Sequence, residues 1–201
     1  MMDRLRKKKS YFVGVLILIL FVSVGLNLYD NLYTKPMMQE RMNYMSAEAF
    51  QSWLDEIKSI KSILERAKTN LDVKEAVNYT FAAKQFANVL EWQIEIPRPP
   101  NFAEHLYLRI SGAAIMLDKA VSAIAMKTPT TLRNLEYETL QRTGNLTATI
   151  ENLVDSVGTV RDGVDPVQQL EKKGVLSQVI NYLKQVEATS IEIWAMYGYY
   201  G

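Results

Sequence analysis

Apolar residues recur at steps of three and four positions along most of the chain beyond residue 35, a spacing that places them on one face of an α-helix. The pattern predicts five helices, over residues 36–68, 72–96, 102–127, 129–160 and 175–197. One face of the last helix is expected to carry Leu176, Val179, Ile180, Leu183, Val186, Ser190, Ile191, Trp194 and Tyr197. No run of alternating apolar and polar residues competes with these helices, so the chain is predicted to be all-α.

The ends of the predicted helices carry residues that start or stop helices. Asp72, with Glu75 three positions later, has the spacing of a capping box for the second helix. Residues 161–163 end the fourth, and a short helical turn is expected from Asp165 to Gly174. Because short linkers join long helices, consecutive helices should be antiparallel. We therefore predict an up-and-down antiparallel bundle of four to five helices.

A different pattern comes before the bundle. Residues 11–26 read YFVGVLILILFVSVGL and contain no charged side chain. Extended to residue 29, this stretch would form a helix roughly 28 Å long, which is close to the hydrocarbon thickness of a bilayer. Residues 11–29 are therefore predicted to be a transmembrane signal-anchor helix.

The charges around this stretch predict its orientation. Five Lys and Arg residues lie within residues 1–10, whereas Lys35 is the only basic residue between position 29 and Arg41. The positive-inside rule then places the N-terminus in the cytoplasm. Residues 1–10 are expected to be a cytoplasmic basic segment, and residues 30–201 an extracytoplasmic helical bundle domain held at the cell membrane by a single pass.

A cleaved signal peptide is the competing interpretation of the same stretch. Ser23, Val24 and Gly25 offer small residues at the two positions that a signal peptidase inspects. The apolar run continues past them, however, and no polar region precedes the possible cut. We expect the helix to be retained as an anchor.

Composition agrees with a folded domain behind an anchor. Apolar residues make up 48% of the chain and charged residues 22%, which is near the average for folded proteins. There are no cysteines, which excludes disulfides, thiolate nucleophiles and cysteine metal sites. The net charge is +1, but residues 34–201 hold 18 basic and 20 acidic residues. A nearly neutral domain without a basic stripe argues against nucleic-acid binding.

Candidate catalytic chemistry is sparse. His105 is the only histidine, whereas a di-iron carboxylate site needs Glu-x-x-His on two helices and catalytic zinc needs two or three His or Cys ligands. No Gly-x-Ser-x-Gly elbow or Gly-rich phosphate loop is present. Acidic pairs such as Glu91 and Glu95 are typical of solvated helix faces. We therefore expect no enzymatic activity, no cofactor and no metal, and no motif supports a small-molecule ligand.

Two sites match the pattern for N-glycosylation. They are Asn78, followed by Tyr79 and Thr80, and Asn145, followed by Leu146 and Thr147. Both lie inside predicted helices, and Asn145 is the better candidate because it follows Gly144. The sequence leaves open whether either asparagine is modified.

The last eight residues are rich in aromatic side chains. Trp194, Tyr197, Tyr199 and Tyr200 lie there, with Gly198 and Gly201 between and after them. In one interpretation, Trp194 and Tyr197 close the end of the core and the rest is a frayed tail. In the other, the four residues form an interaction patch, because Tyr and Trp are enriched at binding hot spots.

These observations favour a structural or protein-interaction role in the cell envelope. Long helices, small-residue stripes and aromatic ends suit a bundle that docks another protein or associates with itself. The alternative is a ligand-binding or sensory bundle that signals through a partner protein, which is an analogy at the level of the fold.

Overall fold

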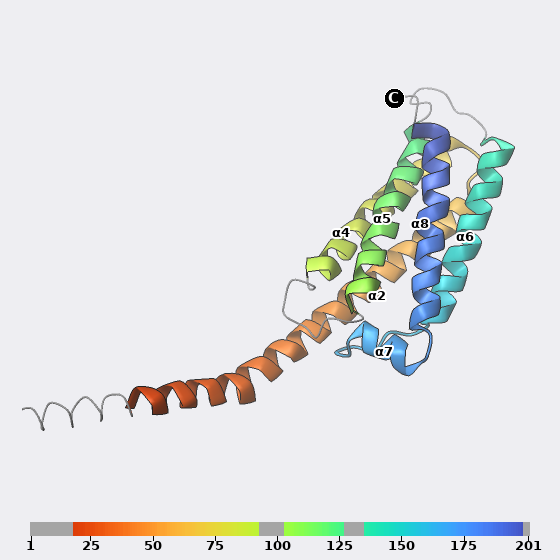
Figure 1. Ribbon diagram of the computed structural model, residues 1–201. Coiled ribbons are helices and arrows are strands. Elements are labelled where there is room, and N and C mark those ends of the chain that lie inside the picture. The colour runs from red at the N-terminus through yellow and green to blue at the C-terminus, as the bar shows by residue number, and fades with distance from the viewer. Residues whose placement is uncertain (1–17, 93–102, 127–134, 199–201) are drawn as a thin grey trace, which may run out of the picture. The chain divides into compact units, whose positions relative to one another are not determined.

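The computed structural model describes residues 18–92, 103–126 and 135–198. Within these ranges every regular element is a helix, which confirms the predicted all-α class (Figure 1). Contacts divide the chain into two units, Met1–Met42 and Asn43–Gly201.

The first unit is helical from residue 18 onward. A π-helical stretch, Asp30–Thr34, follows the first turns, and helix α2, Lys35–Arg66, begins directly after it. The backbone N–H of Lys35 donates to the carbonyl of Asp30, five residues back. Pro36 has no N–H, and in an α-helix its ring would clash with the carbonyl four residues back. The wider π turn in front of Pro36 accommodates that ring, so the chain stays helical through the proline.

None of the helices in the described ranges is both long and apolar enough to count as a membrane span. The predicted cytoplasmic segment, residues 1–10, and the first part of the predicted anchor, residues 11–17, lie outside those ranges.

The second unit is a helical bundle. After α2 it contains α3 (Asn70–Lys74), α4 (Ala76–Trp92), α5 (Ala103–Met126), α6 (Tyr137–Val157), α7 (Pro166–Lys172) and α8 (Leu176–Gly198). Helices α4, α5, α8 and α6 lie side by side in that order, and the part of α2 that belongs to this unit lies behind them in Figure 1. An ion pair between Lys61 and Glu151, 3.2 Å, joins α2 to α6.

Long helices that follow one another in the chain run antiparallel, as predicted. In the α4–α5 pair, Lys84 at the middle of α4 contacts Asp118, whereas Glu91, seven residues later on α4, contacts Ser111, seven residues earlier on α5. Helices α5 and α8 are neighbours in space but run parallel to each other. This is because α6, which lies between them in the chain, is at the outer edge of the layer.

The core follows the predicted periodicity for most of the bundle. On α4 and the short helix before it, Val73, Ala76, Thr80, Ala83, Ala87 and Leu90 recur at steps of three and four positions, and all six are fully buried. On α8 the prediction was wrong at two positions. Ile193 is fully buried, whereas Ile191 and Trp194 are 42% and 36% exposed. The buried residues from Leu183 step by three and four through Ser190 to Ile193, and this phase turns Ile191 and Trp194 away from the core.

Two helix boundaries also differ from the prediction. The helix after α2 is capped by Thr69, not by Asp72: the Thr69 side chain accepts from the Asp72 N–H, and Asp72 accepts from the Thr69 N–H at 2.9 Å. The backbone N–H groups of Lys68 and Thr69 both donate to the Asp72 carboxylate and lower its pKa. Helix α6 ends at Val157, because Gly158 adopts a φ of 62° that a helix cannot continue.

The predicted short turn after α6 is present as α7. Asp165 caps it by accepting the Val167 N–H at 2.8 Å, and Pro166 occupies its first position. Gly174, with a φ of 70°, separates α7 from α8.

Candidate interaction surface

The predicted aromatic patch lies at the end of α8, and the structure describes half of it. Trp194 and Tyr197 are on α8, whereas Tyr199 and Tyr200 lie outside the described residues. The two described side chains have different surroundings.

Tyr197 is part of the contact between α6 and α8. It is partly buried against the core, and its hydroxyl is hydrogen-bonded to the fully buried Thr139. Burial, and to a smaller extent the negative charges of Glu136 and Glu138, raise the pKa of Tyr197 to about 12. The phenol is therefore neutral at physiological pH and closes this end of the bundle.

Trp194 faces α5 and solvent. Its ring lies 5.2 Å from the Nζ of Lys119, a cation–π distance. One turn below it on α8, Ile191 is exposed as well. Trp194 and Ile191 thus present a continuous apolar surface next to a cation.

Helix α5 contributes the other side of this surface. Between residues 106 and 126 it is buried on almost every side, and its exposed residues are Leu108, Ile115, Lys119 and Met126. Their spacing of seven, four and seven positions places them on one narrow line along the helix. Three of the four are apolar, so the part of α5 that reaches solvent is itself largely hydrophobic.

Two close contacts define how α5 and α8 are aligned along their axes. A Cβ added to Gly112 would meet a carboxylate oxygen of Glu187 at 3.3 Å, and Lys119 contacts Trp194. Gly112 and Lys119 are seven residues apart on α5, and their partners Glu187 and Trp194 are also seven residues apart on α8. Ile115 and Ile191 therefore lie at nearly the same level along the two helices.

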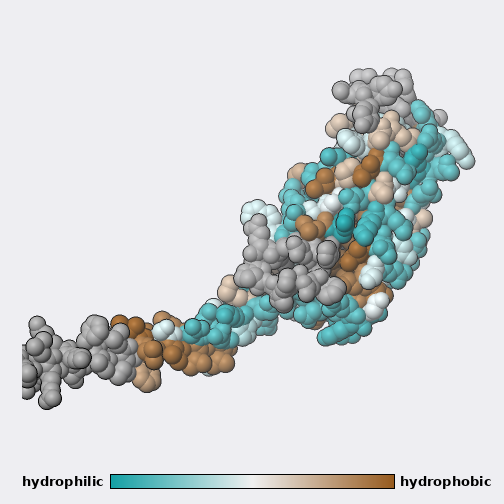
Figure 2. Space-filling model, viewed as in Figure 1, coloured by the Kyte–Doolittle hydropathy of each residue, from teal (hydrophilic) through white to brown (hydrophobic). Residues whose placement is uncertain are grey.

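We call this surface the α5–α8 seam and define it by Leu108, Ile115, Lys119, Glu187, Ile191 and Trp194. In the view of Figure 2, hydrophobic residues interrupt the hydrophilic surface over α5 and α8.

The charged residues of the seam, Lys119 and Glu187, lie at different levels along α5 and α8. Lys119 lies beside Trp194, toward the C-terminal ends of the two helices. Glu187 lies toward their N-terminal ends, over Gly112, and pairs with Arg109 at 3.5 Å. Because Gly112 has no side chain, the Glu187 carboxylate can lie across α5. The apolar centre at Ile115 and Ile191 therefore has the Lys119 ammonium on one side and the Arg109–Glu187 ion pair on the other.

Elsewhere, polar groups inside the bundle join helices. The Lys84 ammonium and the Thr80 hydroxyl both donate to Asp118, at 2.6 and 2.9 Å. Tyr107 on α5 lies 3.4 Å from Asp165, which ties α5 to the cap of α7. These contacts hold α4, α5 and α7 together.

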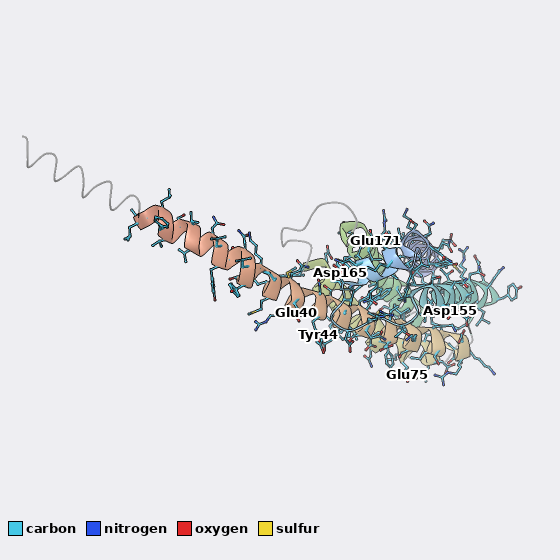
Figure 3. All side chains as sticks on the ribbon, turned by 90° about the horizontal axis from the view of Figure 1, so that it is seen from below. Glu40, Tyr44, Glu75, Asp155, Asp165 and Glu171 are labelled. Atoms are coloured by element: carbon cyan, nitrogen blue, oxygen red, sulfur yellow. The ribbon has the colours of Figure 1, made fainter. Side chains whose placement is uncertain are left out.

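No group of three or more His, Cys, Asp or Glu side chains in the described ranges could hold a metal ion. Figure 3 shows the labelled carboxylates Glu75, Asp155 and Glu171 lying apart from one another. The side chain of His105 lies outside the described set.

A shallow crevice among α2, α6 and α7 has no interior space that a water molecule could occupy. Its lining residues are Phe50, Val157, Thr159, Val160, Pro166, Gln169, Leu170 and Lys173. Small-molecule pockets usually exceed about 300 Å³. Lys173 donates to the carbonyls of Val157 and Thr159 here, so the crevice serves to cap the end of α6 and gives no support for a ligand.

Both candidate glycosylation sites lie on helices. Asn78 on α4 and Asn145 on α6 are exposed, whereas Thr80 and Thr147 are buried and hydrogen-bonded. Transfer of a glycan would therefore have to precede formation of these helices, and the modification remains a prediction.

No family model, curated protein or solved structure matches this chain.

Proposed function

We propose that this chain is a membrane-anchored, extracytoplasmic helical-bundle protein that binds another protein chain through the α5–α8 seam. The observation that carries the proposal is the exposed apolar line on α5, a helix whose other residues between 106 and 126 are buried or half-buried, next to the exposed Ile191 and Trp194 of α8. Apolar residues grouped on the surface of a folded domain typically mark an interaction site.

The composition of the seam suits protein recognition. Tryptophan is among the residues that contribute most to protein interfaces when it becomes desolvated. Lys119 against the Trp194 ring gives a contact that strengthens when water is excluded. A partner that covers Ile115 and Ile191 would remove apolar surface from water, at about 25 cal/mol per Å².

The proposed anchor rests on the N-terminal sequence and on exposure in the first unit. The uncharged stretch 11–26 follows five basic residues, which is the pattern of a signal anchor. Eight apolar side chains between Leu18 and Leu28 are more than half exposed. A bilayer would remove these side chains from water.

Membrane extraction and thiol labelling test the anchor. In cells producing the full chain with a C-terminal tag, we expect the protein to stay with the membrane after alkaline extraction. Because the chain has no cysteine, Gln85→Cys provides a single thiol on the exposed face of α4. A membrane-impermeant maleimide should label it in intact cells. A soluble protein, or labelling only after lysis, would overturn the anchor or its orientation.

Photocrosslinking tests the binding surface. A photoreactive amino acid at Ile191 should form adducts with a protein chain in intact membranes. The same amino acid at Gln85, which is also exposed but lies on α4, is the matched control. Equal yields at the two positions would remove the proposal that the seam is the binding surface.

A further inference from the structure

We infer that the α5–α8 seam binds a second copy of this chain across a two-fold axis at the level of Ile115 and Ile191. The inference rests on the proposed function, since it takes the same seam as the binding surface and names its partner. A symmetric dimer requires one patch to be complementary to itself. The charges of the seam meet that requirement.

The two charges lie at equal distances from the apolar centre. Lys119 is four residues beyond Ile115 on α5, and Glu187 is four residues before Ile191 on α8. At 1.5 Å per residue, each charge is about 6 Å from the level of the two isoleucines, in opposite directions. A two-fold rotation about an axis that crosses the helices at this level exchanges the two positions.

The rotation brings opposite charges together twice. Helix α5 of one copy then faces α5 of the other in the antiparallel sense, and Lys119 comes opposite Gly112 of the second copy. The Glu187 carboxylate lies over Gly112, within 3.3 to 3.4 Å of where a Cβ would be. Each Lys119 therefore meets a Glu187 of the second copy, and that carboxylate lies between Lys119 and its own Arg109. Ile115 packs on Ile115 and Ile191 on Ile191 between these pairs.

The size of the seam predicts a weak dimer. From Leu108 to Ser122, α5 is about 21 Å long, and two helices side by side present a width of roughly 20 Å. The dimer would bury on the order of 800 Å² in total, in the range of transient complexes. Association is therefore expected to depend on concentration and should weaken on dilution in detergent.

Thiol crosslinking tests the contact directly, because the natural chain has no cysteine. Full-length Ile115→Cys in membranes should give a disulfide-linked or bismaleimide-linked dimer. Gln85→Cys, at an exposed position of α4, should give little. Absence of the Ile115→Cys dimer, or equal yields from the two variants, would overturn the inference.

Charge reversal tests the orientation. Lys119→Glu places two acidic residues at each contact of its own homodimer, and Glu187→Lys places two basic residues there. Each change, added to Ile115→Cys, should lower the homodimer yield about tenfold, because like charges oppose association. When the two variants carry different tags and are produced together, one contact of the mixed dimer pairs the glutamate introduced by Lys119→Glu with the lysine introduced by Glu187→Lys. The other contact pairs the natural Lys119 with the natural Glu187, so the mixed dimer should form at a higher yield than either homodimer. Circular dichroism confirms that each variant is folded.

The outcomes separate this inference from the proposed function. If Ile115→Cys links only to a chain of different mass, and Trp194→Ala lowers that yield, the seam binds a different partner and the dimer is excluded. If homodimers of the two reversal variants form as well as the parental dimer, the proposed register is excluded. If the thiol at position 115 links to nothing, the dimer fails, and a photocrosslinker at Ile191 without adducts then removes the proposed function as well.

Discussion

The Lys119 ammonium on α5 lies 5.2 Å from the centre of the Trp194 ring on α8. Three residues further along α8, Tyr197 turns the other way and meets Thr139 on α6. Trp194 therefore makes a contact at the surface, whereas Tyr197 on the same helix packs at the end of the core. The surface contact gives the seam its tryptophan, and the buried one stabilises the bundle.

Two buried hydroxyls should respond oppositely to removal. Ser190 is fully buried and its Oγ has no hydrogen-bond partner among the described residues, whereas Thr139 is fully buried and hydrogen-bonded to Tyr197. Ser190→Ala removes an unsatisfied group and should leave the free energy of unfolding unchanged or raise it by about 1 kcal/mol. Thr139→Val should lower it by about 1 to 2 kcal/mol. Thermal unfolding of the full chain, followed by circular dichroism, measures both, and a larger loss for Ser190→Ala would contradict the assignment.

Removing only one partner of the Lys84–Asp118 ion pair should lower the stability of the bundle. The two side chains are 29% and 19% exposed, and Thr80 also donates to the carboxylate. Lys84→Met leaves Asp118 partly buried without its cation and should destabilise the bundle by about 1 to 3 kcal/mol. Adding Asp118→Asn should restore part of that loss, because the remaining charge is then removed. Additive losses in denaturant unfolding of the single and double variants would show that the two residues do not interact.

Tyr197 predicts a loss of stability in alkali. Its pKa is raised to about 12 by burial and by Glu136 and Glu138, whereas an unfolded tyrosine titrates near 10. The folded state therefore favours the neutral phenol. The stabilisation is fully present below pH 10 and is lost as the pH rises toward 12. Tyr197→Phe should reduce this part of the pH dependence in unfolding titrations between pH 9 and 12. Superimposable profiles for the two proteins would refute the role of this phenol.

Two glycines should respond oppositely to alanine. Gly144 lies within α6, and an added Cβ would meet nothing within 4 Å, so Gly144→Ala should stabilise the bundle by about 0.5 to 1 kcal/mol. Gly158 has a φ of 62°, and Gly158→Ala should destabilise by about 1 kcal/mol or more. Melting temperatures compare the two. If both variants shifted the melting temperature in the same direction, the result would contradict a helical conformation at Gly144 and a positive φ at Gly158.

The helices could be predicted from sequence because their signal is local. The spacing of apolar residues located the bundle and the buried positions of α4, and the Asp165–Pro166 pair located α7. The phase of α8 was harder, since Ile191, Ile193, Trp194 and Tyr197 offer several apolar faces in two turns. Which face is buried depends on the neighbours of α8. The cap at Thr69 was missed because Asp72 is a strong capping type, although Thr69 with Asp72 at the third position also has the required spacing.

The seam could not be predicted from the same local signals. The spacing of Leu106, Ile110 and Leu117 indicates the core face of α5, and all three are buried. The helix is apolar on other sides as well, so its sequence alone does not mark Leu108 and Ile115 as a binding surface. Its significance depends on α5 and α8 being parallel neighbours, although α6 and α7 lie between them in the chain. The aromatic content of the C-terminus did single out Trp194. Its partner Lys119, 75 positions earlier, carries no local signal of the contact.

The most direct test of the account is the photocrosslink from Ile191 in intact membranes, compared between two aromatic variants. Phe81 is the matched control for Trp194: it is 55% exposed, and Lys84 lies 5.6 Å from its ring centre, but it lies on α4. We expect Trp194→Ala to lower the yield of protein adducts at Ile191 about tenfold, because a buried tryptophan contributes about 2 kcal/mol or more to an interface. Phe81→Ala should leave the yield unchanged. If both variants retain the full yield, or both lose it equally, the seam is not the binding surface of this protein.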